Sequence, residues 1–236
     1  MASKSENLED YFLQQMKEFR IVLSIGLKGS GKTYSSLKYI KYMLEKEPEV
    51  YDKYLLILPS YRYEQHDSYQ WLEQHKKKVN VYPYYSGIIF EQLIAKQQAL
   101  ANKNKPLVKY FFLFDDCTVA GNSLFNADDY LIEAIATCRH LQVGMWFNAH
   151  GASKVMPPIL RSNADFIFIF TISNGKLFET LFEEFCSMNI EDLKSAFKEF
   201  RQQYRNHMKE QEFNSFIISV RNSAIDWTTK GWKLFS

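Results

Sequence analysis

Residues 20–33 read RIVLSIGLKGSGKT, and this stretch decides the fold that we expect. Its first part, residues 20–25, is an apolar and β-branched run that predicts a buried strand. The second part, residues 26–33, matches the pattern GxxxxGK(S/T) at every defined position. A helix is expected directly afterwards, at residues 34–47. Glycine is scarce, with nine in the chain, yet three of them (Gly26, Gly29 and Gly31) lie in this one turn.

A glycine-rich turn between a strand and a helix binds phosphate for physical reasons. Glycines let the backbone curl so that successive N–H groups point inward, and the helix adds the positive end of its dipole. Lys32 is expected to reach the β- and γ-phosphates of ATP, and Thr33 to supply a hydroxyl to Mg²⁺. The alternative is a tight turn with a solvated lysine. The residues expected to contact the nucleotide are Gly26, Lys28, Gly29, Ser30, Gly31, Lys32 and Thr33.

Composition excludes several classes of protein. The chain has 236 residues, which suits one α/β domain, alone or with a small appendage. A net charge of +2 excludes a strongly basic protein that coats nucleic acid. Three widely spaced cysteines suggest neither zinc nor disulfides, and no signal peptide or membrane-spanning run is present, so a soluble intracellular protein is expected. Aromatic residues make up 16%, which indicates a core built on rings.

Apolar runs and helical periodicity outline the rest of the chain. Further strands are expected at residues 54–58, 110–114, 143–147, 166–170 and 213–220. Helices are expected at residues 5–18, 86–102 with Ser86 as the N-cap, 127–141, 155–162 (helix or turn), 176–188 and 190–209. Residues 60–86 are polar and aromatic and predict no clear element.

Buried strands that alternate with helices indicate an α/β fold with a parallel sheet covered on both faces. With the phosphate loop, this predicts a P-loop NTPase core of the ASCE or RecA-like type. We expect an N-terminal helix in residues 1–19, the ATPase core in residues 20–175, and a C-terminal helical and β extension, residues 176–236, packed on the core.

Two strands are followed by polar residues that suit hydrolysis. Asp115 and Asp116 come directly after the run YFFLF, which is the Walker B arrangement. Asp115 would hold Mg²⁺, and Asp116 would polarise the attacking water. Asn148 follows residues 143–147, a strand expected between the P-loop strand and the Walker B strand, and its amide could reach the γ-phosphate or the water. The alternatives are capping or loop aspartates and a loop asparagine.

Two arginines are candidates for a finger that reaches a neighbouring subunit's nucleotide. Arg139 is expected to close the helix at residues 127–141, and Arg161 follows a Pro-Pro-Ile-Leu segment. The alternative for each is a cation at a helix C-terminus or a surface ion pair. His140 and His150 have no metal-ligand spacing and are interpreted as structural.

Four blocks carry a resemblance to a known family: GLKGSGKT, FFLFDD, ATCRHLQVGMWFNAH and MPPILRSNADFIFIF. In this order they resemble the FtsK/HerA superfamily and, more closely, the genome-packaging ATPases of poxviruses and other nucleocytoplasmic large DNA viruses. The similarity covers residues 20–172, and more weakly the C-terminal tail. One departure is Asn148, where cellular relatives usually have Gln.

The resemblance implies an ATP- and Mg²⁺-dependent motor, a pentameric or hexameric ring that moves double-stranded DNA into a preformed capsid. It implies capsid vertex or portal proteins as partners, no membrane segment, and a place in the cytoplasm or nucleus of an infected cell or in the virion. Carried over by position, the site within one subunit consists of Lys32, Thr33, Asp115, Asp116 and Asn148. Arg139 is then the better candidate for the finger, and Arg161 is the second.

Other functions stay open at this point. The basic run at residues 75–78, with Tyr82, Tyr84 and Tyr85 close by, could face DNA phosphates, although such a run also suits a solvated surface. A nucleotide-gated switch or adaptor with slow hydrolysis is one alternative function. A small-molecule kinase is another, but the sequence shows no acceptor-pocket or lid motif. The Asp115–Asp116 pair after a buried strand favours hydrolysis.

Overall fold

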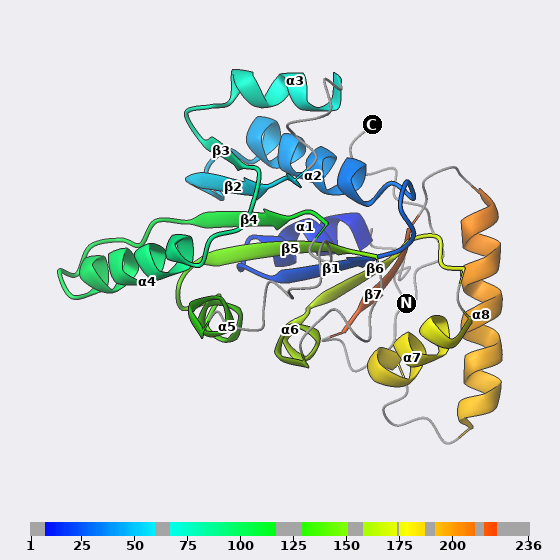
Figure 1. The fold of residues 1–236 in the computed structure, drawn as a ribbon. Coiled ribbons are helices and arrows are strands. Elements are labelled where there is room, and N and C mark those ends of the chain that lie inside the picture. The colour runs from blue at the N-terminus through cyan, green and yellow to red at the C-terminus, as the bar shows by residue number, and fades with distance from the viewer. Residues whose placement is uncertain are drawn as a thin grey trace, which may run out of the picture.

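The computed structural model describes residues 8–59, 67–116, 129–150, 158–173, 175–186, 192–210 and 215–220. Seven strands among these residues form one sheet, in the order β3-β2-β4-β5-β1-β6-β7 (Figure 1). The strands are β1 (Ile21–Ile25), β2 (Lys53–Ile57), β3 (Val79–Tyr82), β4 (Tyr110–Phe114), β5 (Val143–Ala149), β6 (Phe166–Ile169) and β7 (Phe216–Ser219). Strands β1 to β6 pair parallel, whereas β7 pairs antiparallel with β6. The predicted parallel α/β sheet is confirmed, with β5 between β4 and β1.

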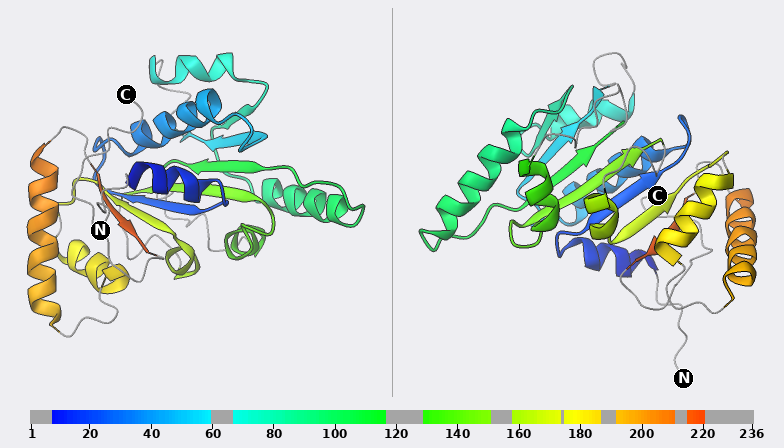
Figure 2. Two further views of the ribbon diagram at one scale, coloured as in Figure 1. Left: turned by 180° about the vertical axis from the view of Figure 1, so that it is seen from behind. Right: turned by 60° about the horizontal axis from the view of Figure 1, so that its bottom comes forward.

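Helices cover both faces of this sheet. They are α1 (Leu8–Met16), α2 (Lys32–Lys46), α3 (Asp67–Gln74), α4 (Ile88–Ala101), α5 (Asp129–Ala136), α6 (Pro158–Asn163), α7 (Gly175–Cys186) and α8 (Leu193–Glu210). Buried side chains of α1, α2 and α3 form one core with the strands, and those of α4 to α8 form a second core on the other face. Figure 2 shows α1 and α2 on the same face in its left view and α4 to α7 on the opposite face in its right view.

Aromatic rings fill both cores, as the composition predicts. On the first face, the Tyr39 ring lies 5.4 Å from that of Trp146 and 5.7 Å from that of Phe12. On the second face, the Phe114 ring stacks on that of Phe147 at 4.5 Å. Such pairs contribute about 0.5–1.5 kcal/mol each beyond the burial of their area. The aromatic excess therefore stabilises the sheet that carries the site.

The structure corrects three expectations. Residues 60–86 contain α3 and the edge strand β3, a four-residue strand whose polar Asn80 breaks up the apolar signal. Helix α4 begins at Ile88 with Gly87 as its N-cap and no side-chain cap, so Ser86 is not the cap; its carbonyl instead accepts from the N–H of Ile89 in a preceding turn. Helix α5 ends at Ala136, because the chain must turn back into β5 by Gln142, which has a φ of +54°. Arg139 therefore lies in a turn rather than at a helix end.

The C-terminal segments pack on the second face. The rings of Phe178 on α7 and Phe200 on α8 stack at 4.7 Å, and Phe200 contacts Phe216 on β7 at 5.4 Å. Strand β7 thereby adds an antiparallel edge to the sheet next to β6. Within the described ranges, no helix is both long and apolar enough to cross a membrane.

Candidate nucleotide site

The predicted phosphate loop lies at the carboxyl edge of the sheet, between β1 and α2. Gly26 donates its N–H to the carbonyl of Ala149 at the end of β5, and Leu27 donates to that of Thr171 beyond β6. A Cβ at Gly26 would come within 2.6 Å of the Phe170 Cβ, so only glycine fits. Gly29 and Gly31 have φ values of +74° and +98°, which other residues rarely adopt. The scarce glycines are therefore placed where the loop needs them. Lys28 is exposed and Ser30 is buried.

Lys32 lies at the first position of α2, and its side chain folds back over the loop. Its Nζ donates to the carbonyls of Gly26 at 2.9 Å and Leu27 at 2.7 Å. Burial lowers the pKa of Lys32, whereas the nearby carboxylates of Asp116 and Asp115 act in the opposite direction. The loop carbonyls thus hold an ammonium group of the kind that binds phosphate in such loops.

Three predicted site residues meet because of the strand register. Phe114 on β4 pairs with Phe147 on β5, so the next residues on these strands, Asp115 and Asn148, lie side by side. The Asp115 Oδ1 accepts from the Asn148 Nδ2 at 2.8 Å and from the Thr33 Oγ1 at 2.8 Å. Asn148 is fully buried, and its amide also donates to the Ser36 hydroxyl at 3.0 Å. In this structure, Asn148 therefore contacts Asp115 directly.

The oxygens of Thr33 and Asp115 fit a magnesium site. Mg²⁺ binds oxygen ligands at 2.0–2.1 Å in an octahedron, whose neighbouring ligands are then roughly 2.9 Å apart. The distance of 2.8 Å between the Thr33 Oγ1 and the Asp115 Oδ1 matches that edge. Because Mg²⁺ at nucleotide sites takes only one or two protein ligands and completes its shell with phosphate and water, these two oxygens suffice.

Asp115 carries a carboxylate whose charged form is disfavoured by burial. Burial raises the pKa of Asp115, and Asp116 raises it further, although the hydrogen bond from Asn148 lowers it. A carboxyl whose pKa is higher in the folded than in the unfolded state binds its proton more tightly when folded. Its contribution to stability is therefore lost as the pH rises from the unfolded to the folded pKa.

Because this charge is buried, we expect an uncharged residue at position 115 to stabilise the fold. Without nucleotide at neutral pH, Asp115→Asn is expected to raise the melting temperature, because the amide removes a buried charge and can still accept from Thr33 and Asn148. A gain of about 1 kcal/mol corresponds to roughly 2–4 °C for a chain of this size. Thermal unfolding followed by circular dichroism measures it. Glu133→Gln, which removes an exposed charge on α5, is the matched control. If Asp115→Asn left the melting temperature unchanged or lowered it, Asp115 would not carry a destabilising buried charge.

Asp116 lies beside a residue that the sequence did not single out for the site. Its backbone is left-handed, with a φ of +49°, a conformation that Asp tolerates better than most residues. The Asp116 Oδ1 lies 2.6 Å from the His150 Nε2. His150, interpreted above as structural, is thus in contact with the predicted water-polarising carboxylate. Its spacing from Asn148 is the signal that could have found it, because residues two apart on a strand share a face.

The two candidate arginines lie elsewhere. Arg139 and Asp165 precede β5 and β6, so they lie at the amino edge of the sheet, opposite the phosphate loop. A five-residue strand such as β1 separates the two edges by roughly 17 Å. Arg139 therefore cannot reach the nucleotide site of its own subunit. Arg161, on α6, pairs instead with Glu184 of α7 at 2.8 Å.

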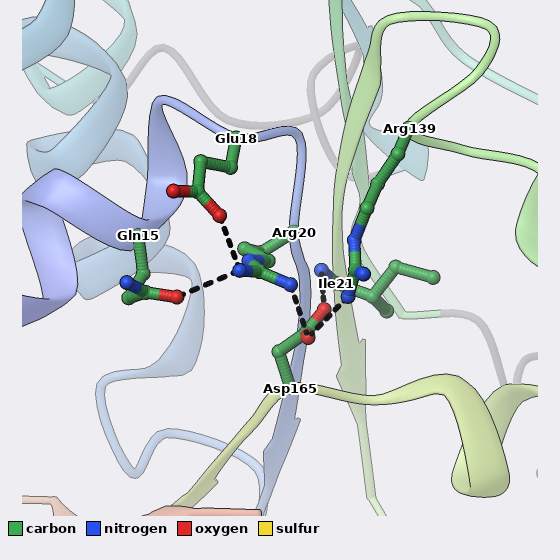
Figure 3. Close-up of polar contacts among 6 residues, drawn as sticks. All are labelled: Gln15, Glu18, Arg20, Ile21, Arg139 and Asp165. Carbon is green, nitrogen blue, oxygen red and sulfur yellow. Dashed lines mark hydrogen bonds and ion pairs between the residues drawn. The ribbon is translucent and has the colours of Figure 1, made fainter. Parts of the chain in front are cut away.

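Arg139 is held by a buried carboxylate (Figure 3). Asp165 is 2% exposed and accepts from the Arg139 Nη2 at 3.2 Å, from the Arg20 Nη1 at 3.4 Å and from the N–H of Ile21 at 2.9 Å. Arg20 also donates to Gln15 and Glu18. The Arg139 side chain nevertheless remains 41% exposed, against 20% for Arg161. The guanidinium of Arg139 is thus oriented but accessible from outside.

The basic run also lies at the amino edge, in the turn between α3 and β3. The carbonyl of Lys77 accepts from the Lys53 Nζ, and the Lys78 Nζ donates to the carbonyl of Pro48. Lys76 and Lys77 are exposed, whereas His75 contacts the Trp71 ring. The structure thus places this run on the surface, far from the phosphate loop.

The comparisons with known proteins agree with this geometry. Residues 9–223 match the family of the poxvirus A32 protein. The chain belongs to the poxvirus A32 family. The resemblance to poxvirus genome-packaging ATPases that the four sequence blocks indicate is confirmed. No curated protein matches this A32-family chain significantly.

Solved structures share the fold of this A32-family protein. The genome packaging NTPase B204 from Sulfolobus turreted icosahedral virus 2, in complex with ATP-γ-S, has a TM-score of 0.59 and 16% identity over 89% of this chain and 96% of that chain. Its complex with AMP has a TM-score of 0.60 and 17% identity over the same shares. EssC (ATPases 2 and 3) from Geobacillus thermodenitrificans has a TM-score of 0.55 and 11% identity over 86% of this chain and 38% of that chain. The P-loop NTPase fold predicted from the sequence is confirmed.

Proposed function

We propose that this A32-family protein is a Mg²⁺-dependent ATPase that translocates double-stranded DNA and packages a viral genome into a capsid. The observation that carries the hydrolytic part is the meeting of Thr33 from the phosphate loop with Asp115 after β4, at 2.8 Å. Lys32 and Asp116 lie at the same edge. The packaging part is supported by the shared fold of B204, a genome packaging NTPase solved with ATP-γ-S.

The residues of the chain divide the work of hydrolysis. Lys32 would bind the β- and γ-phosphates. Thr33 and Asp115 would hold Mg²⁺, which would supply positive charge to the phosphates. Asn148 holds the Asp115 carboxylate through its amide. Asp116 accepts a hydrogen bond from the attacking water and orients it toward the γ-phosphate.

The assembly follows from what packaging requires. We infer a homo-oligomeric ring of five or six subunits around double-stranded DNA, with capsid vertex or portal proteins as further partners in the infected cell. The exposed lysines of the 75–78 run are candidates for contacts with DNA phosphates. Arg139 is the candidate for the finger that enters a neighbour's site, because it is accessible whereas Arg161 is paired with α7.

The test combines turnover with mass. Purified protein is expected to hydrolyse ATP, faster with double-stranded DNA than without, and to form a closed oligomer with ATP and DNA in mass measurements. Binding of ATP without turnover, at concentrations that support oligomers, would overturn the motor and favour a nucleotide-gated switch. Transfer of the γ-phosphate to a small molecule, rather than to water, would favour a kinase.

A further inference from the structure

His150 bridges two residues of the proposed ATPase site. It directly follows β5, which lies between the strands that carry the phosphate loop and the acidic pair. Its Nδ1 lies 3.3 Å from the Lys32 Nζ, and its Nε2 lies 2.6 Å from the Asp116 Oδ1. The side chains of His150 and Asp116 are 31% and 23% exposed, so both are accessible to water.

The hydrogen bonds of Lys32 determine which ring nitrogen of His150 carries the proton. An ammonium has three protons to donate and no lone pair with which to accept. Two of the donors of Lys32 go to the carbonyls of Gly26 and Leu27, and the third is left for the His150 Nδ1. That nitrogen must therefore be the acceptor, so a neutral ring carries its proton on Nε2. The Nε2–H then donates to the Asp116 carboxylate.

Asp116 depends on such a partner for its orientation. Its left-handed backbone turns the chain directly after β4, and its side chain is only partly buried. The bond to His150 engages Oδ1 and leaves Oδ2 with lone pairs for another donor. A water that attacks a γ-phosphate held by Lys32 is such a donor, since Lys32 and Asp116 lie on either side of the same ring.

We propose that His150 is a positioning residue for hydrolysis. Its Nε2–H fixes the Asp116 carboxylate for the attacking water, and Lys32 selects the ring tautomer that can do so. This inference rests on the proposed ATPase function. It assigns to His150 an effect on the rate of the chemical step, exerted through Asp116, and none on the affinity for nucleotide.

Two substitutions separate this role from a structural one. His150→Phe keeps a planar ring but removes both hydrogen bonds, and kcat is expected to fall by about tenfold to 100-fold, the usual loss when a positioning partner is removed. His150→Gln restores a donor for Asp116 and an acceptor for Lys32, and its kcat is expected to return to within about threefold of wild type. The dissociation constant of ATP-γ-S should stay within about threefold in both variants. Glu133→Gln, at an exposed position on α5 outside the site and the basic run, is the control.

Several results would overturn the proposal. A wild-type kcat in His150→Phe would show that Asp116 needs no such partner, and a Gln variant as slow as Phe would show that the hydrogen bonds are irrelevant. A tenfold or larger change in ATP-γ-S affinity would make His150 a nucleotide-binding residue instead. An inactive wild-type protein would refute the proposed ATPase, whereas active wild type with active His150→Phe refutes only the role of His150.

A measurement without turnover tests the same geometry. The chain has five histidines, so the ring signals that disappear in His150→Gln identify His150 in ¹⁵N-labelled protein. Without nucleotide, the ¹⁵N pattern is expected to show the proton on Nε2 and Nδ1 as the acceptor, and Lys32→Ala is expected to weaken this preference. A ring with its proton on Nδ1 instead would overturn the proposal.

Discussion

Lys32→Ala is expected to weaken ATP binding by about 100-fold or more and to abolish turnover, because charged hydrogen bonds to the phosphates are lost. The fold should survive. Burial lowers the pKa of Lys32, so removing its charge relieves a desolvation penalty, and Ala is a good helix former at the start of α2. Calorimetric titration with ATP-γ-S measures the affinity, and circular dichroism checks the fold.

Lys28→Ala is the matched control for Lys32→Ala. Lys28 lies in the same loop and carries the same charge, but its side chain is exposed. Lys28 is expected to contact the nucleotide through its backbone. The affinity of Lys28→Ala for ATP-γ-S should therefore stay within about threefold of wild type. If Lys32→Ala bound ATP-γ-S as tightly as wild type, the assignment of the phosphate loop would be wrong.

Arg139→Ala is expected to bind ATP normally and to lose turnover by about 10³-fold, the usual effect of removing an arginine finger. The nucleotide site of each subunit keeps all its own residues in this variant. Asp165 still accepts from Arg20 and from the N–H of Ile21, so the fold should persist. Steady-state hydrolysis, with thermal unfolding as a check, measures both effects.

Mixing two inactive variants tests whether Arg139 acts on a neighbour. Lys32→Ala subunits retain Arg139, and Arg139→Ala subunits retain an intact phosphate loop. Where such subunits adjoin in the right order, one complete site forms, so partial activity should return on mixing. If activity does not return on mixing, Arg139 does not act on the nucleotide site of a neighbouring subunit. The same experiment with Arg161→Ala then decides whether Arg161 is the finger or merely pairs with Glu184.

The core of the fold could be predicted from the sequence because its signals are local. The apolar runs of β1, β4 and β6 are too uniform to suit a half-exposed strand, and the glycine pattern allows one loop conformation. Strand β3 was not predicted, because an edge strand needs only one apolar face and this one has only four residues, too few for a clear apolar pattern. The end of α5 escaped because the position of β5, not helix propensity, decides where the chain must turn.

In the candidate site, too, the residues in local motifs could be predicted, whereas contacts between distant parts of the chain could not. Lys32, Thr33 and Asp115 were predicted from motifs whose residue types follow from the chemistry of phosphate and magnesium. The part played by His150 depends on the predicted strand order, which places β5 between β4 and β1, and also on the left-handed turn at Asp116, which no pattern of neighbouring residues predicts. Asp165 was missed because its partners Arg20 and Arg139 are distant in the sequence and meet only at the amino edge.

The separation of Arg139 from the phosphate loop restricts the symmetry of any assembly that uses both. One lies at the amino edge of the sheet and the other at the carboxyl edge, so a contact that joins them uses different patches on the two copies. Such a heterologous interface leaves one patch of each kind free in a dimer. A two-fold axis satisfies the same contact only where one patch spans both edges, because a two-fold interface pairs residue i with j and j with i. If the rotation from one subunit to the next closes after a whole number of subunits, the assembly is a ring in which every subunit contacts the next one head to tail. If the rotation does not close, the assembly is a filament.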